Sequence, residues 1–240
     1  NFVLMAILGG LIFMGAWMLM EKGAPAFRNE QEGKAGHSGS TLKQQVVEVL
    51  TTPQFLLYCM TGTLTMGGIL GYAINAPFVA MTLGGLDGFG FALAFGFTGM
   101  LQLLASIAAP SVVAKIGRRR TIAVGLVLAL ASAVGMLLVP VAKPLWFFAP
   151  AAVGTIGFNI IYGTASGLTL EKFKHCAGLA ASIDGCARMA GGGLVAAGVK
   201  LLGLNVFSTV ALAFGFLLLP MVLVMRDIHL QIAQTPQTIA

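Results

Sequence analysis

The chain consists largely of apolar runs of about 20 residues, and this pattern limits it to one broad class of fold. Seven such runs are present, at approximately residues 1–20, 55–81, 91–114, 121–141, 145–169, 177–199 and 205–225. With a rise of about 1.5 Å per residue, a helix of this length crosses the roughly 30 Å of hydrocarbon in a bilayer. Strands of a membrane barrel would instead alternate apolar and polar residues. We therefore expect an all-α integral membrane protein with seven transmembrane helices.

The composition supports the same conclusion. Only 9% of the residues are charged, whereas a soluble domain carries about 25%. The net charge of +6 is compatible with nucleic-acid binding, but the chain has no basic stripe with interleaved aromatic residues. Basic residues are also expected in the cytoplasmic loops of membrane proteins. We expect the lipid bilayer as a partner, and no nucleic acid.

The basic residues predict the orientation of the chain. Eleven of the 14 Lys and Arg residues lie in one set of alternate loops and in the tail, and two, Lys143 and Lys200, lie in the other set. Loops rich in Lys and Arg remain in the cytoplasm. The first set is therefore predicted to be cytoplasmic, with residue 1 outside the cell and residue 240 inside.

Residues 21–54 differ from the rest of the chain because they are polar and rich in Gly and Ser. Their first half is typical of a flexible linker. The second half, S-T-L-K-Q-Q-V-V-E-V-L, predicts a short amphipathic helix at the membrane surface. This segment divides the chain into one span followed by six. Because the chain begins within an apolar run and without Met, we expect it to be a fragment.

Several polar side chains fall inside the predicted spans. Any one of them alone is typical of an interhelical hydrogen bond. Their occurrence in different spans instead predicts a polar-lined interior that admits a substrate. These candidates for a substrate cavity are Tyr72, Asn75, Gln102, Asn159 and Tyr162.

Asp184 and Arg188 are the remaining candidates, and they lie in the middle of the apolar run 177–199. Four residues apart on a helix, they share one face and can form an ion pair. A charge near the bilayer centre costs roughly 2.5–3.5 kcal/mol, so such residues face the interior of the bundle. The pair either neutralises itself structurally or lines a path for substrate or ions, and the sequence leaves both interpretations open.

Gly117, Arg118, Arg119 and Arg120 form a tight turn between two spans, on the predicted cytoplasmic side. The positive charges either fix the topology or form a gate, pairing with acids or helix C-termini of a neighbouring helix in one conformation.

Two pairs of glycines, Gly67 with Gly71 and Gly163 with Gly167, have the G-x-x-x-G spacing that allows helices to approach closely. We interpret both pairs as packing contacts.

The sequence contains no pattern that indicates an enzyme, a cofactor or a metal site. Its three cysteines have no metal-ligand spacing, and its three histidines lack partners at ligand spacing. No phosphate-binding loop or nucleophile elbow is present.

The stretch 163–193 resembles the link between the tenth and eleventh helices of Bcr/CflA-type drug exporters, which belong to the major facilitator superfamily. The stretch Y-A-I-N-A-P-F-V at 72–79 is similar to the seventh helix of that family. Further similarities lie in the eighth helix, the turn after it and the link itself, namely Phe91, Phe95, Gly117, Arg118, Arg119, Leu170, Glu171, Phe173, Ala177, Gly178, Gly185, Gly191 and Gly192.

This resemblance implies an order of domains. Residues 1–20 would be the last helix of the N-terminal bundle and residues 21–54 the cytoplasmic loop between bundles. Residues 55–225 would form the C-terminal six-helix bundle, and residues 226–240 a cytoplasmic tail. The N-terminal half of the same transporter would be a partner, and the location would be a bacterial inner membrane.

The resemblance also implies a function, which is proton-coupled export of small amphipathic molecules, or multidrug efflux, by alternating access. The family usually has an apolar residue at position 184 and often Gln at position 188, so the charged pair is a departure. A superfamily importer of a small metabolite is an alternative. A seven-helix receptor or sensor is another, although the last span has no lysine for a retinal Schiff base.

Overall fold

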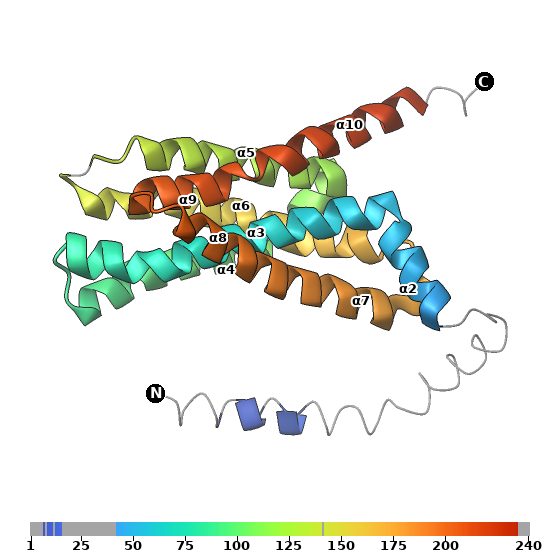
Figure 1. Cartoon of the computed structure of the whole chain (residues 1–240), viewed down its shortest axis with the longest axis horizontal. Coiled ribbons are helices and arrows are strands. Elements are labelled where there is room, and N and C mark those ends of the chain that lie inside the picture. Colours follow the sequence, from blue (N-terminus) through green and yellow to red (C-terminus); the bar gives the residue numbers. More distant parts are fainter. Residues whose placement is uncertain (1–6, 8, 12, 16–41, 141, 235–240) are drawn as a thin grey trace. The chain divides into compact units, whose positions relative to one another are not determined.

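The computed structural model describes residues 7, 9–11, 13–15, 42–140 and 142–234. The chain divides into two compact units, residues 1–45 and 46–240. Every regular element in the described residues is helical, which confirms the predicted all-α fold (Figure 1). Positions 7, 9–11 and 13–15 of the predicted first span are helical. The rest of that span and the predicted linker as far as residue 41 lie outside the described residues.

A short helix, α2 (Leu42–Thr51), confirms the helix predicted for the end of the polar segment. Val49 of this helix is completely buried, in an apolar cluster with Phe55 and Phe173. The rings of Phe55 and Phe173 meet edge to face, with centroids 5.7 Å apart. The end of α2 is therefore fixed by packing, while its location at the membrane surface stays a prediction.

The first long helix of the second unit is α3 (Pro53–Pro77), which continues into the π-helix η1 (Phe78–Leu83). Pro53 occupies the first turn, where its missing N–H costs nothing. Gly85 then turns the chain with φ of 67°. Helix α4 (Gly88–Ile116) begins where the Asp87 carboxylate accepts a hydrogen bond of 2.8 Å from the Gly90 backbone N–H.

Gly117 separates α4 from α5 (Arg118–Leu137) by a single residue with φ of 82°, a conformation that favours glycine. The predicted tight turn is therefore confirmed. A 3₁₀ turn, η2 (Pro144–Phe147), leads into α6 (Phe148–Leu170).

The next segment is helical from residue 177 to residue 201, but its middle turn is wider than an α-helix. After the 3₁₀ turn η3 (Lys174–Cys176), it consists of α7 (Ala177–Cys186), the π-helix η4 (Ala187–Gly191) and α8 (Gly192–Leu201). Gly203, with φ of 64°, turns the chain into α9 (Val206–Gly215) and α10 (Leu218–Gln234).

Five helical segments of the described residues are long and apolar enough to cross a membrane: Pro53–Leu83, Gly88–Ile116, Arg118–Leu137, Pro144–Leu170 and Val206–Arg226. They match five of the predicted spans. The predicted span 177–199 is helical throughout, but it is not among the five. It carries Asp184 and Arg188, which lower its hydropathy, so the count of seven stays a prediction.

Helix α6 packs against α3, α4 and α5 and so lies at the centre of the bundle. Its contact with α5 is close because Gly125 and Gly157 face each other. A Cβ added to Gly157 would lie 2.6 Å from the Gly125 carbonyl oxygen. On another side, the Phe158 and Phe214 rings meet edge to face with centroids 4.6 Å apart, which joins α6 to α9.

Helix α3 packs closely along η4 and α8, and the segment α7–η4–α8 runs beside it in Figure 1. Small residues again permit the approach. A Cβ at Gly192 would lie 3.1 Å from the Gly67 backbone nitrogen, and one at Gly71 would lie 3.3 Å from the Cβ of Ala213. The packing role predicted for Gly67 and Gly71 is therefore confirmed.

The packing role predicted for Gly163 and Gly167 is wrong. A Cβ at either position would have no neighbour within 4 Å among the described residues. Both glycines instead border an open cavity that α4 and α6 line. The spacing alone could not show this, because it gives the relation between the two glycines and not the direction in which they face.

We expect Gly157→Ala to destabilise the bundle while Gly163→Ala, on the same helix, does not. The first adds a methyl group against the α5 backbone, and such overpacking costs about 1–3 kcal/mol. The second adds it in open space. Thermal unfolding of the purified full-length protein in detergent measures the difference. Equal melting temperatures for the two variants would contradict this account of the contact between α5 and α6.

Candidate functional site

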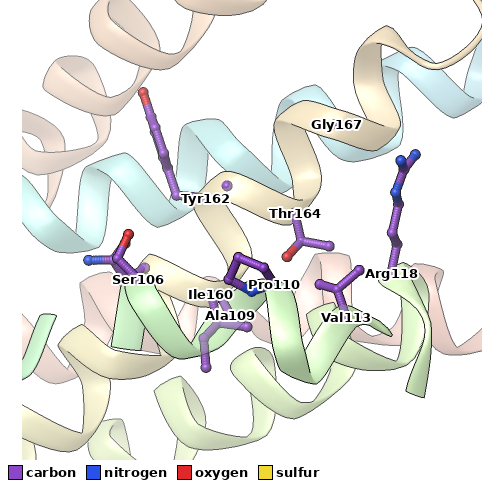
Figure 2. A pocket seen from close by; sticks show the side chains of 11 residues that line it. Ser106, Ala109, Pro110, Val113, Arg118, Ile160, Tyr162, Thr164 and Gly167 are labelled. Atoms are coloured by element: carbon purple, nitrogen blue, oxygen red, sulfur yellow. The ribbon is translucent and has the colours of Figure 1, made fainter. Parts of the chain in front are cut away.

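Two cavities lie beside α6 within the second unit. The larger, of about 440 Å³, is bordered by α4 and α6 and by Arg118 at the start of α5. In Figure 2, Pro110 and Ile160 lie along its length, Ser106 lies toward one end and Arg118 toward the other. The smaller, of about 280 Å³, is lined from α3, α4 and α6. Ligand pockets for small molecules are typically about 300–1,000 Å³, so the larger cavity suits a small molecule and the smaller one lies just below this range.

Three of the predicted cavity residues line these cavities. Asn159 and Tyr162 border both cavities, and Gln102 borders the smaller one. The Asn159 side-chain amide donates a hydrogen bond of 3.1 Å to the backbone carbonyl of Gln102, which ties α6 to α4. The structure thus brings together, at the smaller cavity, two predicted residues that lie 57 positions apart in the sequence.

Tyr72 and Asn75 lie elsewhere and line neither cavity. Tyr72 is buried in the core, where its hydroxyl shares a hydrogen bond of 2.8 Å with the Thr98 hydroxyl. Its ring stacks against Phe95 and Phe147. The Asn75 amide donates to the Gly71 carbonyl of its own helix at 2.7 Å. The contacts of Tyr72 are those of a core packing residue, and the hydrogen bond of Asn75 lies within its own helix.

Asp184 and Arg188 form a buried ion pair, with exposed fractions of 3% and 1%. The Arg188 Nε lies 2.9 Å from the carboxylate oxygens of Asp184. Arg188 belongs to the π-helix η4, and single wide turns of this kind occur frequently at functional sites. The predicted pair is therefore present and faces the interior of the bundle.

The Arg188 guanidinium is enclosed by groups from two other helices. Its Nη1 donates a hydrogen bond of 3.1 Å to the Tyr162 carbonyl oxygen, and its Cζ lies 4.8 Å from the centre of the Tyr162 ring. Gly62 of α3 provides the space on another side, because a Cβ at this position would collide with the guanidinium carbon. A cation over an aromatic face is attracted by the ring, more so when it is desolvated.

A polar group from α6 also reaches Asp184. The Ser166 hydroxyl donates to a carboxylate oxygen at 3.5 Å. The carboxylate therefore has partners on η4 and on α6. Cys59 of α3 is buried in the apolar cluster with Phe55 and Phe173, as expected of a small packing residue.

The turn residues Gly117 to Arg120 lie at one end of the larger cavity, where Arg118 borders it. Arg118 Nη1 lies 3.4 Å from Oε1 of Glu171. Glu171 is the C-cap residue of α6. Both side chains are about half exposed, and such pairs contribute little to stability, about 0–1 kcal/mol. The pair joins α5 to α6, and Arg120 is exposed. Whether the turn fixes the topology or acts as a gate stays a prediction.

Sequence reasoning missed several residues around the cavities and the ion pair. They are Gly62, Ser106, Pro110, Thr164 and Ser166. Pro110 stands inside an apolar span and could have been singled out as a kink or an interior position. The others are small residues in a chain with 32 glycines, and nothing in their spacing distinguishes them.

A third cavity, of about 430 Å³, lies between α5 and the helices α9 and α10. It is lined almost entirely by aliphatic side chains, including Leu130, Val134 and Leu212. Its polar lining is limited to the Ser208 side chain, so it offers little for orienting a polar ligand.

A family model with the description Major Facilitator Superfamily matches residues 1–197. The chain belongs to the major facilitator superfamily. Comparisons with curated proteins and with solved structures yield no match. Members of this superfamily are multi-pass membrane transporters of small molecules and not enzymes, so the two cavities lie in a transporter. The predicted bilayer and small-molecule partners follow from the same membership.

The buried ion pair of this superfamily member predicts a strongly non-additive pair of substitutions. Arg188→Gln or Asp184→Asn alone leaves one buried charge without its partner, which costs about 3–5 kcal/mol. The double variant leaves no buried charge and is expected to be closer to the wild type than either single variant. Melting temperatures of the four purified full-length proteins measure this coupling.

Additive losses in the double variant would contradict the interpretation of these two residues as one neutralised pair. Lys200→Gln, which removes an exposed positive charge from the same helical segment, provides the control and should leave the melting temperature unchanged.

Proposed function

We propose that the protein exports small amphipathic molecules across a bacterial inner membrane in exchange for protons, by alternating access. The observation that carries the proposal is the polar lining of the cavities by Gln102, Asn159 and Tyr162, beside the buried pair of Asp184 and Arg188. A cavity with mostly apolar walls and a few polar groups suits amphipathic molecules. Charged residues inside membrane spans are typical of substrate and ion paths.

We further propose that residues 55–225 act as the C-terminal bundle of a longer transporter, joined to residues 1–20 through the loop 21–54. Helix α4 supports this arrangement. Its buried side chains are Thr98 and Ala105, whereas Phe97, Met100 and Ile107 are exposed. In alternating access two bundles face each other around a central site, and an apolar face beside the cavities is suited to such a neighbour.

The turn from Gly117 to Arg120 would then act at the cytoplasmic end of the path. The ion pair between Arg118 and Glu171 is exposed and weak, so a small change in free energy suffices to break it. Arg118 also borders the larger cavity. Separation of α5 from the end of α6 would therefore change the opening of that cavity, which is the action expected of a gate. The tail 226–240 would lie on the same side of the membrane.

A superfamily importer of a small metabolite is the second candidate. The same cavities and the same ion pair suit import as well as export, because alternating access works in both directions. The direction of transport is set by the gradients and by the coupling ion. Membership of the superfamily favours either transporter over the seven-helix receptor considered from the sequence.

We expect cells that lack their own exporters and produce the full-length protein to expel amphipathic drugs in a manner that a proton uncoupler prevents. Asp184→Asn should abolish this efflux when the rate is normalised to the amount of protein in the membrane, because it removes the carboxylate from the buried pair. Lys200→Gln should leave the efflux intact.

The measurement is the rate of efflux for a panel of cationic, neutral and anionic compounds. Uptake that depends on the protein would favour the importer. If every compound accumulates equally fast in cells that produce the protein and in cells that lack it, the proposed function is refuted. Efflux that Asp184→Asn does not affect would place the path among the amide and tyrosine side chains instead.

A further inference from the structure

We propose that Arg188 is a binding site for an anionic group, a carboxylate above all, on the transported molecule, and that the Tyr162 ring separates this site from the cavities. The inference rests on the proposed transport function and narrows its substrates to amphipathic molecules that carry an acid. It concerns the one guanidinium that the described structure holds in complete burial.

Arg188 has more hydrogen-bond donors than the protein groups around it accept. A guanidinium has five N–H donors and no acceptor. Nε donates to Asp184 and Nη1 donates to the Tyr162 carbonyl. Nη2 is buried and has no partner among the protein groups that the structure describes. Buried donors are rarely left unsatisfied, because the loss of their hydrogen bonds to water is not compensated. A free donor on a charged group is therefore a site for an acceptor.

The residues around Arg188 are shaped to hold the guanidinium in this position. Gly62 leaves space that any other residue would fill, and the wide turn η4 brings Arg188 against α3. Tyr162 contacts the guanidinium with both its ring and its carbonyl oxygen. A side chain needed merely to neutralise Asp184 would not require this fit.

Tyr162 links Arg188 to the cavities, because it contacts the guanidinium and also borders both the 440 Å³ and the 280 Å³ cavity. In Figure 2 its ring is directed away from the side chains of α4, and its face lies over the Arg188 guanidinium. In our proposal, a rotation of this one side chain is the movement that lets a molecule in the cavities reach the guanidinium.

The chemistry favours a carboxylate over a cation or a neutral amide. A guanidinium binds carboxylates through charge-assisted hydrogen bonds, which are roughly twice as strong as neutral ones. Asp184 opposes an incoming acid because both are negative, although its charge is balanced by Nε of Arg188. Loss of the Asp184 charge should therefore strengthen the binding of an acid, whereas loss of the Arg188 charge should weaken it.

The test compares two ligands that differ in one group, 1-naphthylacetate and 1-naphthylacetamide, on the purified full-length protein. Their dissociation constants are measured by calorimetry or by the shift in melting temperature. We expect the acid to bind about tenfold or more tightly than the amide, the factor that one charged hydrogen bond provides. The double variant Asp184→Asn with Arg188→Gln should lose this preference, and Lys200→Gln should retain it.

The comparison of acid with amide on the wild type needs no variant, so the test remains decisive if the double variant does not fold. Asp184→Asn alone adds a result that a purely structural pair would not give. It should bind the acid more tightly than the wild type and be stabilised by it more strongly, since the acid then supplies the negative partner that Arg188 has lost. Tyr162→Phe keeps the ring over Arg188 and should keep the preference.

Equal affinity for acid and amide in the wild type would overturn the proposal. So would an unchanged or weakened affinity of Asp184→Asn for the acid. If either result occurs while the cells still expel cationic or neutral compounds, the proposed export stands and only the anion site is refuted. If the protein prefers the acid but the cells transport none of the compounds, the proposed export is refuted and the anion site stands.

Discussion

The buried ion pair of Asp184 and Arg188 is the interaction on which the packing of the neighbouring helices depends. An unpaired charge in such surroundings costs several kcal/mol, so Asp184 and Arg188 must be held together and supplied with polar partners. The wide turn η4 brings Arg188 against α3, where Gly62 leaves room for the guanidinium. The carbonyl and the ring of Tyr162 complete the enclosure from α6. Three helical segments are therefore fixed relative to one another by a single ion pair.

Helix α6 joins this ion pair to the cavities. One side of the helix packs against α5 through Gly157, where the two backbones nearly touch. Other sides present Asn159 and Tyr162 to the cavities and Ser166 to Asp184. Because a helix moves as a rigid element, a shift of α6 that changes the cavities would also change the contacts of the ion pair. This physical link is what a transporter needs if the occupancy of its cavity is to alter the state of a charged group.

The helices of the bundle could be predicted from the sequence, because the apolar runs are long and are bounded by Pro, Gly and charges, as at Thr52-Pro53 and Gly117. The ion pair could also be predicted from the four-residue spacing of its members. The surroundings of Arg188 could not, since they depend on how η4 widens and on which side of α3 faces it. The same limit explains the positions of Tyr72 and Gly163. Helical spacing relates residues within one helix, but the rotation of a helix about its axis is set by packing against its neighbours, so Tyr72 lies in the core and Gly163 borders a cavity.

The central claim is that transported molecules occupy the cavities beside α6. A cysteine at position 159, in a full-length protein whose native cysteines, among them Cys59, Cys176 and Cys186, are replaced by serine, tests it most directly. The rate at which a thiol reagent modifies Asn159→Cys is measured with and without a compound that the cells expel. The account predicts that the compound slows modification at position 159 and leaves unchanged the modification of Asn75→Cys, which lines neither cavity. An equal effect at both positions, or no effect at position 159, would contradict it.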